Sequence, residues 1–124
     1  MTDINNSPLY LQLANSLCDE ILKDKYAAGE RMPSVRDIAE RVQINTNTAN
    51  RTYDHLQSKG IIYKERGLGY YLSADAKEII ANMRREKFLN KQLPEIFRQM
   101  NLLKIDFKTI EEEYNKQILK NNEN

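Results

Sequence analysis

The first part of the chain carries one apolar stripe with a four-residue spacing, which is typical of one face of a helix. The positions at this spacing are Leu9, Leu13, Leu17 and Ile21. Serine favours the position before a helix and proline its first turn, so Ser7 and Pro8 predict where the helix begins. We therefore predict a helix from about Pro8 to about Asp24.

Two shorter helices follow. Ser34 and Asp37 are spaced as in a capping box, in which each side chain accepts a hydrogen bond from a backbone amide at the helix start. They predict a helix that ends near Arg41. A third helix is predicted to begin after Asn45, which suits the N-cap, and to end at Gly60, because glycine adopts the left-handed conformation found at helix ends. Its inward face carries Ala49, Tyr53 and Leu56.

The pattern then changes to two short runs rich in β-forming residues, 61–63 and 70–72. They flank the sequence Gly67-Leu68-Gly69, and two such runs around a glycine-bearing turn predict a β-hairpin. Because a two-stranded hairpin is marginally stable alone, we expect it to pack on the helices and to leave its tip free.

Residues 74–124 carry apolar stripes that predict three further helices. Pro94 suits the first turn of the second of them, and Asp106 suits the cap of the third. The apolar positions are Ile79, Ile80, Met83, Leu93, Ile96, Phe97, Met100, Leu103, Phe107, Ile110, Tyr114 and Ile118. The predicted fold is mainly α with a small β-hairpin wing, and it divides into residues 1–73 and a short all-helical region at 74–124.

Composition limits the protein class. Hydrophobic residues make up 40% and charged residues 30% of the 124 positions, as in ordinary globular proteins. We see no apolar run long enough for a bilayer and no secretory signal at the start. The single cysteine excludes an internal disulfide and suits a reducing compartment. We therefore expect a cytoplasmic protein without a membrane partner.

The few candidate catalytic or metal-binding groups also narrow the function. One histidine, His55, and one cysteine, Cys18, do not supply the usual zinc ligands. No glycine-rich loop opens a helix after a strand as in phosphate-binding motifs. We interpret Cys18 as a small buried apolar group and His55 as a surface or boundary residue. The sequence thus predicts no enzyme, no metal and no cofactor.

The net charge bears on DNA binding only when it is counted separately for each segment of the chain. Residues 1–73 hold equal numbers of basic and acidic residues. Residues 31–66, however, hold seven basic and four acidic residues. The local excess matters more for nucleic-acid binding than the total, because binding depends on where the positive charge lies.

Four motifs in order along the chain resemble the winged helix-turn-helix domain of GntR-family bacterial transcription regulators. They are residues 8–13, residues 29–39, Asn47-Thr48 with Arg51 and Tyr53, and residues 66–69. The start of the third helix at 45–48 and the short C-terminal part look most like the YtrA subfamily. The resemblance implies a homodimeric repressor, in a group whose members are often encoded beside the transporters they control.

Each motif has a role that physical chemistry supports. The amide-rich start of the second helix suits a phosphate, with Ser34 as a contact or only as a cap. Arg36 is interpreted as a DNA contact, and the alternatives are a solvated arginine or a pair with Glu40. In helix-turn-helix proteins the start of the third helix enters the major groove, although Asn45 and Thr48 also suit local capping. The candidate DNA-binding residues are Ser34, Arg36, Asn45, Thr46, Asn47, Thr48, Asn50, Arg51, Arg66, Gly67 and Gly69.

Three details extend this hypothesis. Asparagine reads adenine through paired hydrogen bonds, and Thr46 stands where relatives often have arginine, so we expect an operator that leans toward A·T pairs. Gln43 stands where relatives often have glycine, and a positive φ there would store about 1 kcal/mol of strain. In the hairpin, the glycines let the backbone approach the minor groove while Arg66 inserts its charge.

The C-terminal stripes predict a homodimer interface, because apolar faces that one chain leaves uncovered are buried by a symmetric copy. An intrachain core against the winged helix is the alternative for some of these residues. The candidate dimerisation residues are Ile80, Met83, Phe88, Ile96, Phe97, Met100, Phe107, Ile110 and Tyr114. The partners are then double-stranded DNA and a second copy, and the sequence does not decide whether a small-molecule effector binds. The other function considered is a winged-helix module for protein assembly without an operator.

Overall fold

The computed structural model describes residues 7–123. The chain forms two compact units that meet between Arg85 and Glu86, later than the boundary predicted after residue 73. The start of the predicted C-terminal region therefore belongs to the winged-helix unit. Among the described residues, no helix is long and apolar enough to cross a membrane.

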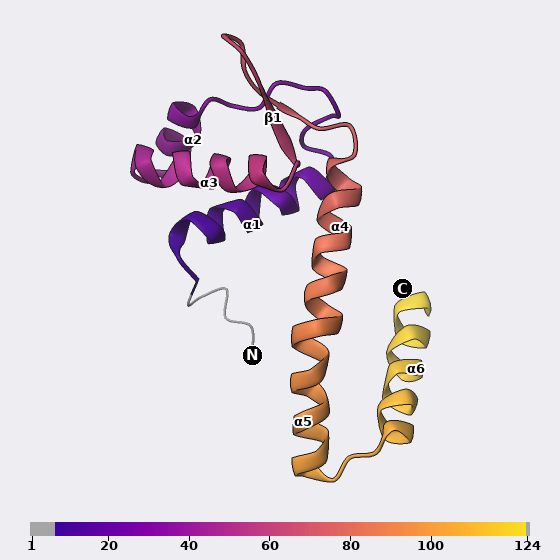
Figure 1. The fold of residues 1–124 in the computed structure, drawn as a ribbon. Coiled ribbons are helices and arrows are strands. Elements are labelled where there is room, and N and C mark those ends of the chain that lie inside the picture. Colours follow the sequence, from indigo (N-terminus) through magenta and orange to yellow (C-terminus); the bar gives the residue numbers. More distant parts are fainter. Residues whose placement is uncertain (1–6, 124) are drawn as a thin grey trace. The chain divides into compact units, whose positions relative to one another are not determined.

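The N-terminal unit begins with the three predicted helices, α1 (Leu9–Leu22), α2 (Val35–Val42) and α3 (Thr46–Ser58), and both α1 and α2 pack against α3 (Figure 1). Helix α1 begins one residue later than predicted, so Pro8 is not its first helical residue. Pro8 occupies the N-cap position and supplies no capping side chain, while the Ser7 carbonyl accepts a hydrogen bond from Gln12 Nε2 at 2.8 Å.

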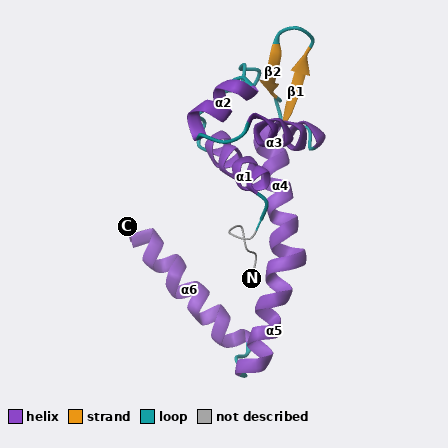
Figure 2. Cartoon of the chain, turned by 90° about the vertical axis from the view of Figure 1, so that its left-hand side faces the viewer, coloured by secondary structure: helices purple, strands orange, loops and turns teal. Residues whose placement is uncertain are grey.

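The predicted hairpin is present as β1 (Ile62–Glu65) and β2 (Gly69–Leu72), which pair antiparallel with Ile62 opposite Leu72 (Figure 2). Residues 29–32 run along the other edge of β2, which the sequence did not indicate. The Gly29 amide donates to the Leu72 carbonyl at 2.8 Å, and the Met32 amide donates to the Tyr70 carbonyl at 2.8 Å. The hairpin is thus anchored to the chain between α1 and α2.

One hydrophobic core joins these elements. The predicted inward residues of α3, Ala49, Tyr53 and Leu56, are fully buried. Thr52 is the buried polar residue of this core, and its hydroxyl donates to the carbonyls of Tyr10 and Thr48, each at 3.0 Å. Burial of a hydroxyl costs little when it is hydrogen-bonded, so Thr52 fastens α3 to the start of α1.

Helix α4 (Ala76–Lys87) starts within the same core. Ile80 is 1% exposed and Met83 packs partly buried against the core. The prediction that Ile80 contributes to a dimer interface is therefore wrong, because its side chain is already covered within its own chain. Arg84 also binds α1, with an ion pair to Asp19 at 2.8 Å and a hydrogen bond to Asn15 Oδ1 at 3.0 Å.

The C-terminal unit contains a π-helical turn (Phe88–Gln92), α5 (Leu93–Leu103) and α6 (Phe107–Glu123). Pro94 lies in the first turn of α5 as predicted. Because proline lacks an amide proton and its ring crowds the carbonyl four residues earlier, the wider π turn directly before it has a physical cause. Asp106 caps α6 as predicted, since its carboxylate accepts from the Thr109 amide at 3.0 Å.

The apolar stripes of this unit are exposed. No residue of α5 is buried, and every side chain of α6 from Phe107 to Asn122 is exposed. Phe107 is 68% exposed, Tyr114 64% and Leu119 65%. This unit therefore presents apolar surface that its own fold does not cover. Isolated helices as short as α5 and α6 are marginally stable in water, so we expect this surface to be buried against another chain.

Candidate nucleic-acid interface

The start of α2 carries the predicted Ser34 cap, which is one of the two hydrogen bonds of the predicted capping box. Ser34 Oγ accepts a hydrogen bond from the Asp37 amide at 3.0 Å, which confirms Ser34 as the N-cap. The Tyr53 hydroxyl of α3 donates to the Pro33 carbonyl at 2.6 Å and fixes this helix start to α3. Arg36 is exposed, and among the residues described it forms no ion pair with Glu40.

The turn between α2 and α3 is tight. Gln43 has φ 55° and ψ 55°. It therefore has the positive φ that would store strain at this position. A side chain in this conformation costs about 1 kcal/mol. The Ile44 amide returns to the Ala39 carbonyl at 2.9 Å, and the chain then enters α3 at Asn45.

One face of the first turns of α3 is exposed to solvent. Asn45 Oδ1 accepts from the Asn47 amide at 2.7 Å, which confirms Asn45 as the N-cap. Thr48 is half-buried. The exposed members of the predicted set on this helix start are Thr46, Asn47, Asn50 and Arg51. Ala49, Thr52 and Tyr53 on the opposite face are buried in the core, so these polar side chains lie on the solvent side of the helix.

The hairpin tip contains the predicted residues Arg66 and Gly67, both exposed. Gly67 has φ 76° and Gly69 has φ 102°, a region that favours glycine. A Cβ at Gly69 would also lie 3.2 Å from Arg31 Nε. Arg31 therefore packs along the wing backbone, and no local pattern in the sequence indicates this contact between distant residues.

Tyrosine rings stiffen the wing. Tyr63 and Tyr71 lie opposite each other on β1 and β2 with ring centroids 5.9 Å apart in a stacked arrangement. On the other face, Tyr70 meets Tyr53 edge to face at 5.0 Å. Cross-strand aromatic pairs stabilise hairpins, so the exposed tip extends from a well-packed base.

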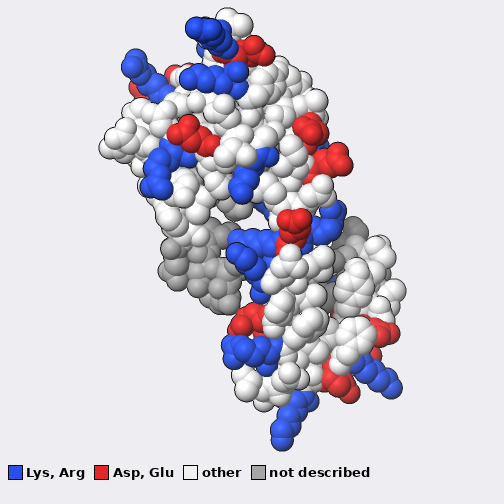
Figure 3. Space-filling view, in the orientation of Figure 1, with Lys and Arg blue, Asp and Glu red and all other residues white. Residues whose placement is uncertain are grey.

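Charges on this surface are mixed. Figure 3 shows Lys and Arg over the hairpin at the top of the view and interspersed with Asp and Glu below it. Arg41 is not available as a free cation, because it pairs with Glu20 at 3.4 Å and donates to the Tyr26 hydroxyl at 3.4 Å. That hydrogen bond raises the pKa of Arg41. The exposed arginines of the predicted DNA-binding set are Arg36, Arg51 and Arg66.

Other chemistry-bearing groups do not form a reactive site. Cys18 is buried, as predicted, and burial raises the pKa of its thiol to about 11. His55 is half-buried, and loss of solvent lowers the pKa of its imidazole. No group of three or more His, Cys, Asp or Glu in the described part of the chain has the arrangement of a metal site.

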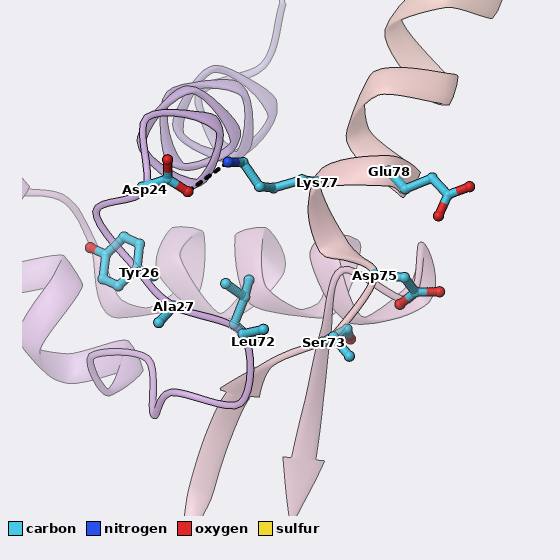
Figure 4. A pocket seen from close by; sticks show the side chains of 10 residues that line it. Asp24, Tyr26, Ala27, Leu72, Ser73, Asp75, Lys77 and Glu78 are labelled. Atoms are coloured by element: carbon cyan, nitrogen blue, oxygen red, sulfur yellow. Dashed lines mark hydrogen bonds and ion pairs between the residues drawn. The ribbon is translucent and has the colours of Figure 1, made fainter.

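A hollow of about 520 Å³ lies where the end of α1, the end of β2 and the start of α4 meet. Figure 4 shows Lys77 reaching across its upper side to Asp24, an ion pair of 2.6 Å. Tyr26 and Leu72 line its inner side. Both members of the ion pair are more than half exposed, so the hollow is an open surface feature.

Comparison with known proteins agrees with this geometry. A model of the family described as bacterial regulatory proteins, gntR family, matches residues 9–72, which is more than half of the chain. The chain belongs to the GntR family. The predicted resemblance is thereby confirmed, and the matched residues run from the first residue of α1 to the last residue of β2.

Individual GntR-family relatives extend the match beyond the winged helix. YhcF of Bacillus subtilis, an HTH-type transcriptional regulator, is 30% identical over 99 residues, which is 80% of each protein. The HTH-type transcriptional repressor YtrA of Bacillus subtilis is 36% identical over 73 residues, 59% of this chain and 56% of YtrA. This agrees with the predicted YtrA-like subfamily.

A crystal structure of a GntR-family transcriptional regulator from Bacteroides thetaiotaomicron is 41% identical, with a TM-score of 0.85 over 91% of this chain and 99% of that one. The predicted fold class, a winged helix-turn-helix followed by C-terminal helices, is thus confirmed. This GntR-family chain is a helix-turn-helix transcription regulator and not an enzyme.

Proposed function

We propose that this GntR-family regulator is a homodimeric repressor that binds a palindromic operator in double-stranded DNA and controls nearby transporter genes. The observation that carries the DNA-binding part is the exposed start of α3, where Asn47 and Asn50 project from a helix whose other face is fully buried. A rigid helix with amide side chains at its free end has the geometry needed to read base edges in the major groove.

Two exposed arginines, Arg36 and Arg66, have separate roles in this proposal. Arg36, next to the capped start of α2, contacts a phosphate and sets the register. Arg66 at the wing tip enters the minor groove, where a narrow A·T tract attracts it. Ser34 holds its own helix start, and the amides of that helix start face the same phosphate.

The remaining DNA-facing residues of the proposal have supporting roles. Thr46 lies at the first position of α3, and Thr48 is half-buried beside it. Asn45 caps the helix. Gly67 lets the hairpin backbone come close to the sugar-phosphate chain, because no Cβ projects there, and Gly69 supports the tip by leaving room for Arg31.

Dimerisation is assigned to the C-terminal unit. The apolar side chains that its fold leaves exposed fit burial against a second copy, because two-fold oligomers bury the same patch from both chains. Met83 packs against the winged-helix core and is assigned there. The proposed interface residues are Phe88, Ile96, Phe97, Met100, Phe107, Ile110 and Tyr114.

Selection of duplexes from a random pool by the purified chain tests the DNA-binding proposal. A two-fold symmetric motif with affinity that falls steeply with salt would support it. A folded chain that enriches no motif would instead favour the protein-assembly module. Arg36→Ala should weaken binding to every duplex and lower the slope of log affinity against log salt by about one ion. Asn47→Ala should chiefly reduce the preference for the selected sequence over others.

Sedimentation equilibrium tests the dimer. Ile110→Glu places a charge in the exposed stripe of α6 and should shift the chain to monomer and weaken binding to the symmetric duplex. Lys116→Gln on the same helix makes the same change in net charge, and Lys116 pairs with Glu113 instead of joining the stripe. It should leave the dimer intact. Equal dissociation by both variants would contradict the assigned interface.

A further inference from the structure

Arg51 is held by an aromatic ring from another helix. Its Cζ lies 4.0 Å from the centroid of the Tyr10 ring in the first turn of α1. This is well within the range of a cation–π contact. No ion pair with Arg51 is formed among the residues that the structure describes, so the ring of Tyr10 is the group that orients its guanidinium.

Tyr10 is itself fixed by α3 at two further points. Its carbonyl accepts the hydrogen bond from the Thr52 hydroxyl at 3.0 Å. Its ring meets the ring of His55 edge to face at 6.2 Å and 75°. Three residues within five positions of α3, namely Arg51, Thr52 and His55, thus hold one tyrosine. These contacts restrict the motion of Tyr10, so its ring offers Arg51 a fixed surface to pack against.

The contact with Tyr10 leaves Arg51 able to bind. A guanidinium carries five N–H donors, and none of them forms a hydrogen bond within the described residues 7–123. Arg51 lies one helical turn after Asn47, on the same exposed side of α3. With Asn47 at the base edges, a residue one turn farther along the helix is placed to reach the flanking sugar-phosphate chain.

We infer that Tyr10 is a positioning residue for DNA binding, and that it holds the Arg51 guanidinium in place to contact a backbone phosphate. This inference rests on the proposed DNA-binding function. The ordering of a long arginine side chain before binding reduces the entropy lost on binding. Tyr10 would therefore contribute to affinity without touching DNA itself.

The experiment compares Tyr10→Leu, Tyr10→Phe, Arg51→Met and the double variant Tyr10→Leu/Arg51→Met in the full chain. The probe is the duplex that the wild-type chain enriches from a random pool, and affinity is measured from low to high salt. Lys23→Met removes an exposed cation at the far end of α1 and controls for loss of net charge.

Arg51→Met should lower the salt slope by about one ion. Tyr10→Leu should weaken binding about two- to five-fold, which corresponds to about 0.5–1 kcal/mol for an exposed cation–π contact. Tyr10→Phe keeps the ring face and should restore the affinity lost in Tyr10→Leu. The double variant should bind no more weakly than Arg51→Met alone, because the ring acts through the arginine.

Fluorinated phenylalanines at position 10 keep the shape of the ring and withdraw charge from its face, so they test the inference even where Tyr10→Leu impairs folding. Affinity should fall stepwise with fluorine number, and this dependence should vanish in the Arg51→Met background. A flat series, or equal losses in Tyr10→Phe and Tyr10→Leu, would overturn the inference.

The inference and the function on which it rests fail differently. If the wild-type chain shows no salt-dependent duplex binding, the proposed function fails and the role of Tyr10 fails with it. If the wild-type chain binds but Arg51→Met binds as tightly, or if Tyr10→Leu adds its full loss to that of Arg51→Met, only the positioning role is overturned.

Discussion

Tyr53→Phe removes one oxygen atom from the centre of the winged-helix unit. The Tyr53 side chain is fully buried, its hydroxyl donates to the Pro33 carbonyl at 2.6 Å, and its ring meets Tyr70 edge to face. The substitution keeps the ring contact and deletes only the hydrogen bond. It therefore isolates the link between α3 and the residue that precedes the Ser34 cap.

The size of the effect follows from what the Pro33 carbonyl loses. A buried acceptor left without its donor costs about 1–3 kcal/mol. Pro33 is half-buried, so water can partly replace the lost donor, and we expect the free energy of unfolding to fall by about 1–2 kcal/mol. Truncation to alanine would also remove the buried ring and should cost about 3–5 kcal/mol.

Urea unfolding followed by circular dichroism measures this difference. The midpoint for Tyr53→Phe should fall while the slope stays unchanged, because the surface exposed on unfolding is the same. Tyr63→Phe is the matched control, since Tyr63 lies on the exposed face of β1 at 39% exposure. An unchanged midpoint for Tyr53→Phe, or an equal fall for Tyr63→Phe, would refute the argument.

The same residue predicts a pH dependence. Burial raises the pKa of the Tyr53 phenol, so the protonated form is favoured in the folded state. This contribution is fully present below the unfolded pKa near 10 and is lost as pH rises toward the folded value. The stability difference between wild type and Tyr53→Phe should therefore shrink in unfolding experiments above about pH 10.

Three further predictions concern other parts of the chain. Gln43→Gly should raise the free energy of unfolding by about 1 kcal/mol, because glycine relieves the left-handed conformation at φ 55°, and Gln43→Ala should show no such gain in the same urea titration. Asp106→Ala should reduce the helical circular dichroism signal at neutral pH. The hydrogen bonds from Thr109 lower the pKa of Asp106, so the difference should disappear only as pH falls below the ordinary range of aspartate. Cys18 should react with a thiol reagent at pH 8 only at the rate of unfolding, because burial raises its pKa to about 11, and rapid reaction of the folded chain would contradict this.

Local signals account for what the sequence predicted well. The caps at Ser34, Asn45 and Asp106 lie within three residues of the amides they bind, so they are visible without any fold. The two strands flank a glycine turn and are close in sequence. The DNA-binding candidates on α3 followed from position, since the start of a helix after a tight turn is recognisable from its cap and its apolar spacing, whereas Arg36 and the wing tip also rested on the resemblance to the GntR family.

Contacts between distant segments account for what the sequence missed. The pairing of residues 29–32 with β2 and the packing of Arg31 on Gly69 join positions about forty residues apart. The cation–π contact of Arg51 with Tyr10 joins two helices across a similar separation in sequence. No periodicity marks such pairs, because spacing along one element reports only which face a residue occupies and not which element covers it.

The sequence by itself determined the order of elements, their caps and the polar start of α3, because these depend on neighbouring residues and on the period of each element. Only the tertiary structure decided which apolar stripes are covered. Ile80 and Phe107 both lie on predicted stripes, yet Ile80 is buried against the winged-helix core and Phe107 is 68% exposed. The hydrophobic effect drives burial without specifying a partner, so that choice is made only when the chain is packed.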